Sequence, residues 1–493
     1  MRDFSKFPAP EYKDTVLAPL FEGFKRHHRG QLMAIHHAHG LMLAELGWLK
    51  PEEARALFGA LREATEGLDL STLVYTGEHE DYFFWLESQL RARLGADLAG
   101  RLHTGRSRND IDHTIFRMVL RTRLLGLLAK LEALVATLLD RAQAGAATLV
   151  VAYTHGQPAQ PTTFGHYLGA LVELLLRDAG RLLHALETVD RCSLGAAAIT
   201  TSGFGLDRGR VAALLGFAEV QENSYGCIAV ADYLAEPYAA MKLLCLGLGR
   251  FVQDLNAWTG FETGHLRVPD ALVQISSIMP QKRNPVPVEH LRLLLSLAAG
   301  KADTILLAIH NTPFTDMNDS EGEVQAAGYE AFDTLERALV LLEAFMAAVE
   351  VDEAKVRRHI AESCITITEV ADSLVREEGV SFRQAHEVAS TLAKRMIALG
   401  ETLANVPMEA FEEAFAEAIG RPPAIAEVRF RDIGTPEHFV AVRTMLGGPA
   451  PAALAASLGR YADGLAGVTA AREACEARVA AAAAERARLV ASA

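Results

Sequence analysis

Long runs of helical periodicity in the middle of the chain most constrain what it can fold into. From residue 113 to about 147, apolar residues recur at steps of three and four, which places them on one face of an α-helix. These residues are Ile115, Val119, Leu120, Leu124, Leu127, Leu131, Leu134 and Leu138. Similar patterns occupy residues 163–190, 232–259, 289–309 and 325–351. Five helices of this length predict a long bundle whose helices cross at shallow angles.

Several of these segments are apolar over more than one helical face. Residues 338–342, for example, read Ala-Leu-Val-Leu-Leu. In a soluble protein, a second apolar face usually indicates burial against another chain. We therefore expect a homo-oligomer.

Shorter helices are predicted on both sides of the bundle. One covers residues 24–47, another begins at Pro51 with acids in its first turn, and a third covers residues 80–94. The Ala-rich tail from residue 450 is also predicted to be helical, because alanine has the highest helix propensity. We expect an all-α subunit with three regions: a mostly helical region 1–110, a central bundle 111–355 and a smaller helical region 356–493.

Composition excludes several classes of protein. The net charge is −14 and the 48 Lys and Arg residues are scattered, which argues against a nucleic-acid partner. The five cysteines lack CxxC spacing, so they indicate reduced thiols and neither disulfides nor a zinc site. No export signal is evident, and no apolar run approaches the ~20 residues that span a membrane. A soluble, cytoplasmic protein is expected.

A polar loop bounded by prolines lies between two of the long helices, at residues 276–285. It reads Ser-Ser-Ile-Met-Pro-Gln-Lys-Arg-Asn-Pro. In a large helical protein such a loop more often binds a ligand than fills a core. Glu289 follows at the head of the next helix, where a carboxylate could orient a histidine or simply complement the helix start.

Three other polar segments are candidates for the same site. Residues 103–110 offer two arginines, Ser and Asn as donors for a carboxylate or phosphate, although a capped helix start would look similar. In residues 154–161, His155 is an acid or base candidate, although a lone histidine is more often structural. The acidic loop 315–323 lacks the calcium-binding spacing, so we assign it no metal; alone it resembles a solvated connector.

These segments together resemble the motifs of argininosuccinate lyases, in the fumarase/aspartase superfamily. The 276–284 loop resembles GSSxMPxKxN, residues 104–110 match TGRSRND, and residues 154–161 are similar to THLQPAQP. Further matches follow in order at residues 222–224, 383–387 and 447–451, so the resemblance covers nearly the whole chain.

The resemblance implies a homotetramer around a twenty-helix core, with each active site built from three subunits. It implies β-elimination of an N-substituted aspartate to fumarate and an amine, without metal or organic cofactor. Ser276 would be the base, His155 paired with Glu289 the acid, and Lys282 with Asn284 would stabilise the dianion. The succinyl carboxylates would be held by Ser107, Arg108, Asn109 and Thr154.

Departures from the family lie mainly where it grips arginine. Asp316, Glu321 and Val324 stand where the family has Tyr, Gln and Lys. A missing Lys leaves the arginine carboxylate without a charge partner. Three positions in the family's N-terminal motifs and one in the histidine loop also differ, at Leu32, His36, Phe83 and Gly156; the glycine leaves extra room beside His155.

We therefore expect an amine portion other than arginine, with a cationic amine facing Asp316 or Glu321. In this the chain resembles ethylenediamine-disuccinate lyase, a relative in the same family. The alternatives are argininosuccinate lyase proper and a non-catalytic relative like the lens crystallins.

Overall fold

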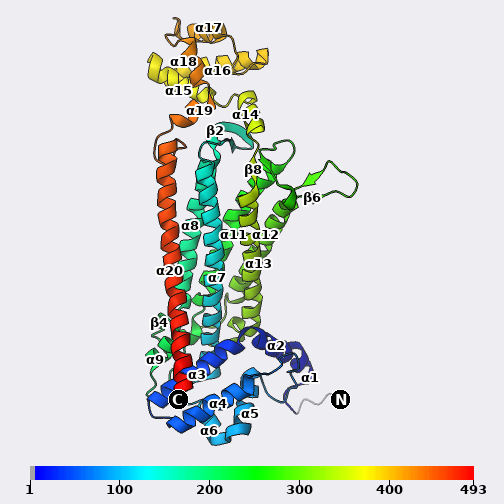
Figure 1. Ribbon diagram of the computed structural model, residues 1–493, viewed down its shortest axis with the longest axis vertical. Helices are drawn as coiled ribbons and strands as arrows, with labels where there is room; N and C mark the ends of the chain where they lie inside the picture. Colours follow the sequence, from blue (N-terminus) through cyan, green and yellow to red (C-terminus); the bar gives the residue numbers. More distant parts are fainter. Residues whose placement is uncertain (1–5) are drawn as a thin grey trace.

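The computed structural model describes residues 6–493, and its centre is the predicted bundle of long helices (Figure 1). The chain runs back and forth along the bundle, and α20 packs along the outside of α7 and α8. The helices are α7 (Arg108–Ala144), α8 (Phe164–Val189), α11 (Asp232–Thr259), α12 (Val286–Ala308), α13 (Gly322–Ala348) and α20 (Pro451–Ser492). All five predicted bundle helices and the helical tail are confirmed.

The first bundle helix begins five residues earlier than its apolar periodicity indicates. Ser107 is extended at the N-cap position, and its backbone N–H donates to Asp110 Oδ1 at 2.8 Å. Such a capping box satisfies amide groups that a helix start leaves without partners. The polar residues 108–112 are therefore helical, although no hydrophobic repeat marks them.

The N-terminal region corrects one prediction. Residues 24–47 do not form one helix, because α2 (Ala18–His27) and α3 (Arg29–Glu45) are separated at His28. His28 has φ −120°, and its Nε2 lies 3.0 Å from the hydroxyl of Tyr329 on α13. The other elements are α1 (Pro10–Tyr12), a π-helical turn (Lys13–Leu17), α4 (Pro51–Thr65), α5 (Tyr82–Leu94) and α6 (Ala96–Arg101).

The C-terminal region is also helical and has its own apolar cluster, centred on Phe411, Phe415 and Phe430. Its helices are α14 (Glu353–Glu362), α15 (Ile367–Glu378), α16 (Phe382–Leu399), α17 (Met408–Ile419), α18 (Glu427–Ile433) and α19 (Pro436–Ala441). By contrast, one continuous buried cluster joins the N-terminal region to the bundle. The three region boundaries stay a prediction.

The strands of the described residues are short and form two-stranded sheets only. The longest pair is β1 (Leu149–Thr154) with β2 (Gln157–Thr163), which is antiparallel. The others are β3 (Arg191–Cys192) with β4 (Glu219–Val220), β5 (Leu266–Arg267) with β8 (Glu350–Val351), and β6 (Gln274–Ile275) with β7 (Arg283–Asn284). Two short helices, α9 (Arg208–Leu214) and α10 (Ser224–Ala229), complete the fold. The predicted all-α class is confirmed.

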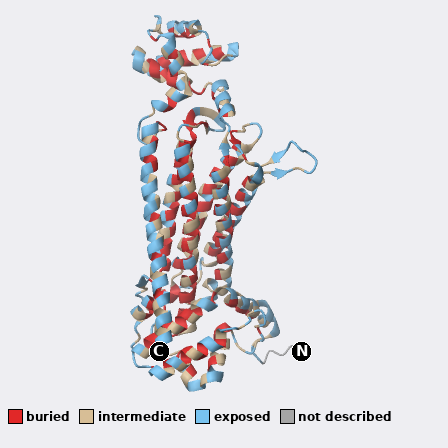
Figure 2. Cartoon of the chain, viewed as in Figure 1, coloured by how far each residue is buried: buried red, intermediate tan, exposed pale blue. Residues whose placement is uncertain are grey.

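Burial differs sharply between the two sides of the bundle helices (Figure 2). Large apolar side chains stay exposed on α11, α12 and α13, with Leu307 at 69% and Leu246 at 55%. The others on these helices are Leu243, Leu293, Leu297 and Val340. A patch of this kind is typical of an interface with another chain, which supports the expected homo-oligomer. Within residues 6–493, no helix is both long and apolar enough to cross a membrane.

The close approach of α13 to α11 gives a stability prediction. A Cβ on Gly328 would lie 2.0 Å from the hydroxyl of buried Tyr238, so Gly328→Ala forces the two helices apart. We expect it to lower the free energy of unfolding by about 3 kcal/mol, measured by urea denaturation. Gly467→Ala on α20 is the matched control, because nothing lies within 4 Å of its Cβ. The control should be neutral or stabilising, and equal destabilisation by both substitutions would contradict the packing argument.

Candidate functional site

The first predicted segment, residues 104–110, forms the tight entry to α7. Gly105 has φ +70°, and a Cβ there would lie 2.6 Å from Leu206. Asp110 is fully buried, and its Oδ2 accepts the backbone N–H groups of Gly195 and Ala197 at 2.8 and 2.9 Å. Burial raises the pKa of Asp110 to about 6, while these backbone donors oppose the shift. Asp110 thus fixes the segment against a distant loop.

Two arginines of this segment have different surroundings. Arg106 is buried, and its Nη2 lies 2.8 Å from Nδ1 of His36, the residue that replaces the family's serine. Arg108 is half-buried and forms ion pairs with Glu80 and Asp81 at 3.0 and 3.2 Å. Of the two, only Arg108 is accessible to a ligand.

An acidic cluster surrounds Arg108. Beyond the Arg108 partner Glu80, it consists of Asp81, Asp112, Asp316 and Glu321, from the N-cap of α5, from α7 and from the loop before α13. Burial, Asp316 and Asp81 raise the pKa of Glu321 to about 7, although Arg108 opposes them. Burial and the neighbouring carboxylates also raise the pKa of Asp112 well above its ordinary value. Because carboxylates outnumber the cation, the cluster must hold protons or take up a positively charged group.

A buried histidine borders this cluster. His113 is 1% exposed, and its Nε2 lies 3.6 Å from Asp316 Oδ1, too far for a good hydrogen bond. Its Nδ1 lies 3.0 Å from the hydroxyl of Tyr233, which fixes the ring. Neither His113 Nε2 nor Asp316 Oδ1 has a hydrogen-bond partner. The cluster therefore has free hydrogen-bonding capacity on its inner side.

The predicted histidine lies in a strained turn. His155 and Gly156 join β1 to β2 with φ of 53° and 73°, which is the pattern of a tight two-residue hairpin. The second position favours glycine, and nothing lies within 4 Å of a Cβ there. The turn therefore exposes His155, and the space beside Gly156 is open in the single chain.

Ser276 lies in the loop between β6 and β7, which projects from the bundle (Figure 1). Its Oγ accepts the backbone N–H groups of Met279 and Ile278 at 3.1 and 3.4 Å. Lys282 and Glu289 are exposed, and Asn284 donates to the carbonyl of Gln274 at 3.0 Å across the hairpin. The loop base is fixed by Arg283, which pairs with Asp270 and with the carbonyl of Val268.

The structure divides the predicted residues into two groups at opposite ends of one subunit. α7 has 37 residues, which at 1.5 Å per residue span about 55 Å. Its start holds Ser107, Arg108 and Asn109, together with Asp316 and Glu321. Its end leads to the other group, which is Thr154, His155, Ser276, Lys282, Asn284 and Glu289. Among the described residues of one chain, no ion pair or hydrogen bond joins His155 to Glu289, so that pairing stays a prediction.

Sequence reasoning did not find three members of the acidic end. Asp81 lies in a motif that drew attention only because Phe83 departs from the family there. Asp112 and His113 lie in the first turns of α7, which was predicted to begin only at residue 113. The spacing of Arg108 and Asp112 was an available signal, because residues four apart on a helix share a face. No group of metal-ligating side chains is assembled within residues 6–493.

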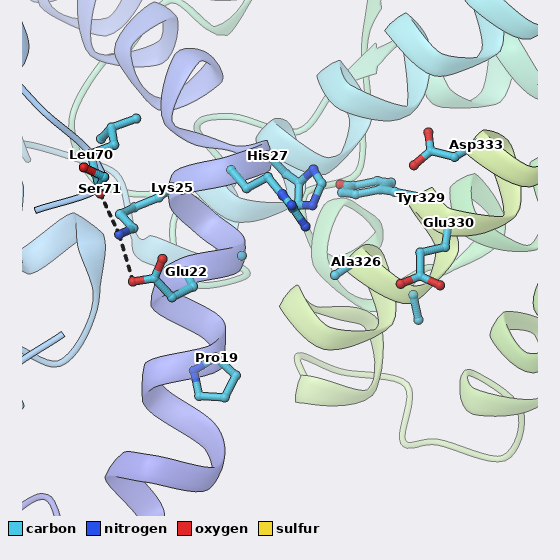
Figure 3. Close-up of a pocket in the computed structure, with 13 residues that line it drawn as sticks. Pro19, Glu22, Lys25, His27, Leu70, Ser71, Ala326, Tyr329, Glu330 and Asp333 are labelled. Carbon is cyan, nitrogen blue, oxygen red and sulfur yellow. Dashed lines mark hydrogen bonds and ion pairs between the residues drawn. The ribbon is translucent and has the colours of Figure 1, made fainter. Parts of the chain in front are cut away.

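A cavity of about 800 Å³ contains none of the predicted site residues. It lies between α2, residues 70–71 and α13, as the close-up shows (Figure 3). Lys25 on its wall is tied to Glu22 and to the carbonyls of Leu70 and Leu73. We do not assign it to the reaction.

Comparison with known proteins supports the motif assignment. Residues 24–300 match a protein-family model described as lyase, and residues 364–441 match one described as argininosuccinate lyase C-terminal. Argininosuccinate lyase 2 of Agrobacterium fabrum is 55% identical over 93% of this chain and 91% of its own length. Argininosuccinate lyase 1 of Shouchella clausii is 31% identical, over 92% and 90%.

A solved structure agrees with the fold. EDDS lyase in complex with formate has a TM-score of 0.85 and 28% identity, covering 96% of this chain and 95% of that one. The chain therefore belongs to the argininosuccinate lyase family of the fumarase/aspartase superfamily, and it is a fumarate-releasing carbon–nitrogen lyase.

Proposed function

We propose that this protein cleaves argininosuccinate into arginine and fumarate. The 55% identity to an argininosuccinate lyase supports this substrate better than our expectation of a non-arginine amine, which rests on loop departures and a structural neighbour at 28% identity. The observation that favours it within the chain is the acidic cluster around Arg108.

The charge of the amine portion distinguishes the two substrates. In argininosuccinate the amine portion contains a guanidinium, an ammonium group and one carboxylate, so its net charge is positive. In ethylenediamine-disuccinate it contains two carboxylates beside its amines, so its net charge is near zero. Asp112, Asp316 and Glu321 would therefore favour the former over the latter. Val324 stands where the family has Lys, so the arginine carboxylate has no charge partner there. This should weaken binding of argininosuccinate without reversing the preference for it over ethylenediamine-disuccinate.

The elimination requires a base that removes a proton beside a carboxylate. Ser276 is our candidate, and its Oγ already accepts two backbone N–H groups, from Ile278 and Met279. Such donors stabilise an alkoxide, which a free serine does not form near neutral pH. Lys282 and Asn284, on the same loop, would meet the negative charge that develops on the substrate.

The departing nitrogen requires a proton, and His155 with Glu289 is our candidate source. Ser107, Arg108, Asn109 and Thr154 would bind the succinyl carboxylates. Because the two groups lie at opposite ends of a subunit, we propose that antiparallel neighbours in a homotetramer bring them together. The exposed apolar faces of α11, α12 and α13 are consistent with that assembly.

A fumarate absorbance assay with both substrates tests the proposal. We expect turnover of argininosuccinate at a kcat/KM at least about tenfold above that of ethylenediamine-disuccinate. The second candidate function, cleavage of an aminopolycarboxylate, is favoured by the fold match and by Val324. Turnover of ethylenediamine-disuccinate with argininosuccinate inert would establish it instead.

The acidic cluster predicts a pH dependence of substrate affinity. A cationic amine portion binds better to ionised Glu321, whose pKa is raised to about 7 by burial and its acidic neighbours. KM for argininosuccinate should fall by up to about tenfold between pH 6 and 8 as that carboxyl ionises. Glu321 also affects stability, because the folded protein holds its proton more tightly than the unfolded chain does. Its contribution to the free energy of unfolding therefore decreases as pH rises from about 4.5 towards 7.

Steady-state kinetics of Glu321→Gln should show a flat KM profile over this range, at the higher value. Glu323→Gln is the control, because Glu323 is exposed two residues further along α13. An unchanged profile in Glu321→Gln would remove Glu321 from amine binding.

A further inference from the structure

A second cavity, of about 620 Å³, lies between α3, α4 and the last turns of α20. Figure 1 shows these three elements together at the end of the bundle where the chain terminates. Its apolar surface comes from Met33, Phe58, Val490 and the alanines of α20. Its polar surface comes from Arg55, Arg62, Arg486, His37, Thr65 and the main chain of Ala493, and no Asp or Glu side chain lines it.

The arginines of this cavity have little compensating charge. Arg486 donates to the carbonyl of Leu214 at 2.6 Å and forms no ion pair within residues 6–493. Arg62 is 3.8 Å from Glu66, and both side chains are more than 70% exposed, so that pair is weak. Arg55 donates to the main-chain oxygen of Ala493 at 2.8 Å. Among the described residues, Arg62 and Arg486 are therefore the two guanidinium groups of the cavity that lack a close carboxylate partner, whereas Arg55 is already engaged.

α3 separates this cavity from the substrate-binding segment. Met33 and His37, four residues apart, line the cavity from one face of the helix. His36 and His39, on another face, contact Arg106 and the carbonyl of Thr104 at 2.8 and 3.0 Å. A ligand in the cavity would therefore press on the helix that supports residues 104–106.

We propose that this cavity is an effector site for an organic anion, one with a carboxylate or phosphate head and an apolar body. The head group would pair with Arg62 and Arg486, and the body would pack on Met33, Phe58 and Val490. The site lies outside the reaction proposed above, and its occupancy can be measured without any substrate.

Isothermal titration calorimetry of the full chain tests the site with three probes of equal length: octanoate, octyl phosphate and octylammonium. We expect an anion to bind at least about tenfold more tightly than octylammonium, because only the head-group charge differs. The better anion identifies the head group. Equal binding of all three would overturn the proposal, since it would show apolar adsorption without charge recognition.

Substitution of the arginines locates the binding. Arg62→Met should weaken binding of the better anion about fivefold to tenfold, and Arg62→Lys should retain most of it. Arg62 is exposed, so neither change should affect folding. Arg91→Met, an exposed arginine of α5 that does not line the cavity, is the matched control. Unchanged binding in both Arg62→Met and Arg486→Met would overturn the proposal.

Coupling to the active site is measured separately. Saturation with the better anion should change KM of the fumarate-releasing reaction at least about twofold, and Arg62→Met should abolish that change at the same anion concentration. Binding without a change in KM would overturn the effector role. Because calorimetry needs no turnover, failure of the proposed function would not be confused with failure of this site.

Discussion

Ser276→Ala is expected to reduce the rate of fumarate formation by at least about a thousandfold while the oligomer stays intact. The hydroxyl is the proposed base, and alanine leaves no group at that position to remove the proton. The backbone N–H groups of Ile278 and Met279 would then have no oxygen to stabilise.

Ser277→Ala is the control for Ser276→Ala, because it removes a hydroxyl from the adjacent, exposed position of the same loop. It should retain most of the activity. The measurements are fumarate absorbance and size-exclusion chromatography with light scattering. Activity within about tenfold of the unaltered protein in Ser276→Ala would exclude Ser276 as the base.

Two inactive variants are expected to restore activity when their chains are mixed. Asn109→Ala damages the start of α7, whereas Ser276→Ala damages a loop near the other end, about 55 Å of helix away. If each site takes these segments from different subunits, a site is intact when one neighbour supplies Ser276 and the other supplies Asn109. In a random equal mixture each condition is met half the time, so about a quarter of full activity should return.

A non-complementing pair is the control for this experiment. Ser276→Ala mixed with Lys282→Met should stay inactive, because both lesions lie on one loop and no chain supplies it intact. Mixtures are prepared by co-expression with two affinity tags and assayed after tandem purification. If activity returns in neither mixture, the sites are not shared between subunits as proposed. If it returns in both, Ser276 and Lys282 act in one site from the loops of different subunits.

The sequence predicted the long helices well because their signal is local. Apolar spacing at three and four residues located α11 to the residue and the other bundle helices to within about five. It could not locate the break at His28, which depends on a hydrogen bond to Tyr329, some 300 residues away. It also missed the first turn of α7, where a capping box and Asp110 replace the apolar pattern.

In the candidate site, too, the sequence located the features that have a local signal and missed those that depend on distant contacts. Ser276, His155 and the 104–110 segment were identified from motifs, since a catalytic loop keeps its residue types in order along the chain. Only half of the acidic cluster was found, because Asp81 and Asp112 approach Asp316 and Glu321 only in the folded chain, where α7 packs against α13. The proposal of argininosuccinate in place of a non-arginine amine therefore rests mainly on the 55% identity to an argininosuccinate lyase.

The sequence by itself determined the helical class and the family and predicted the residues for an elimination, because all three depend on short-range patterns. Only the tertiary structure decided that these residues lie at two ends of one subunit and that four carboxylates join Glu80 around Arg108. The physical reason is that electrostatic and steric contacts act over a few ångströms of space, whatever the separation along the chain.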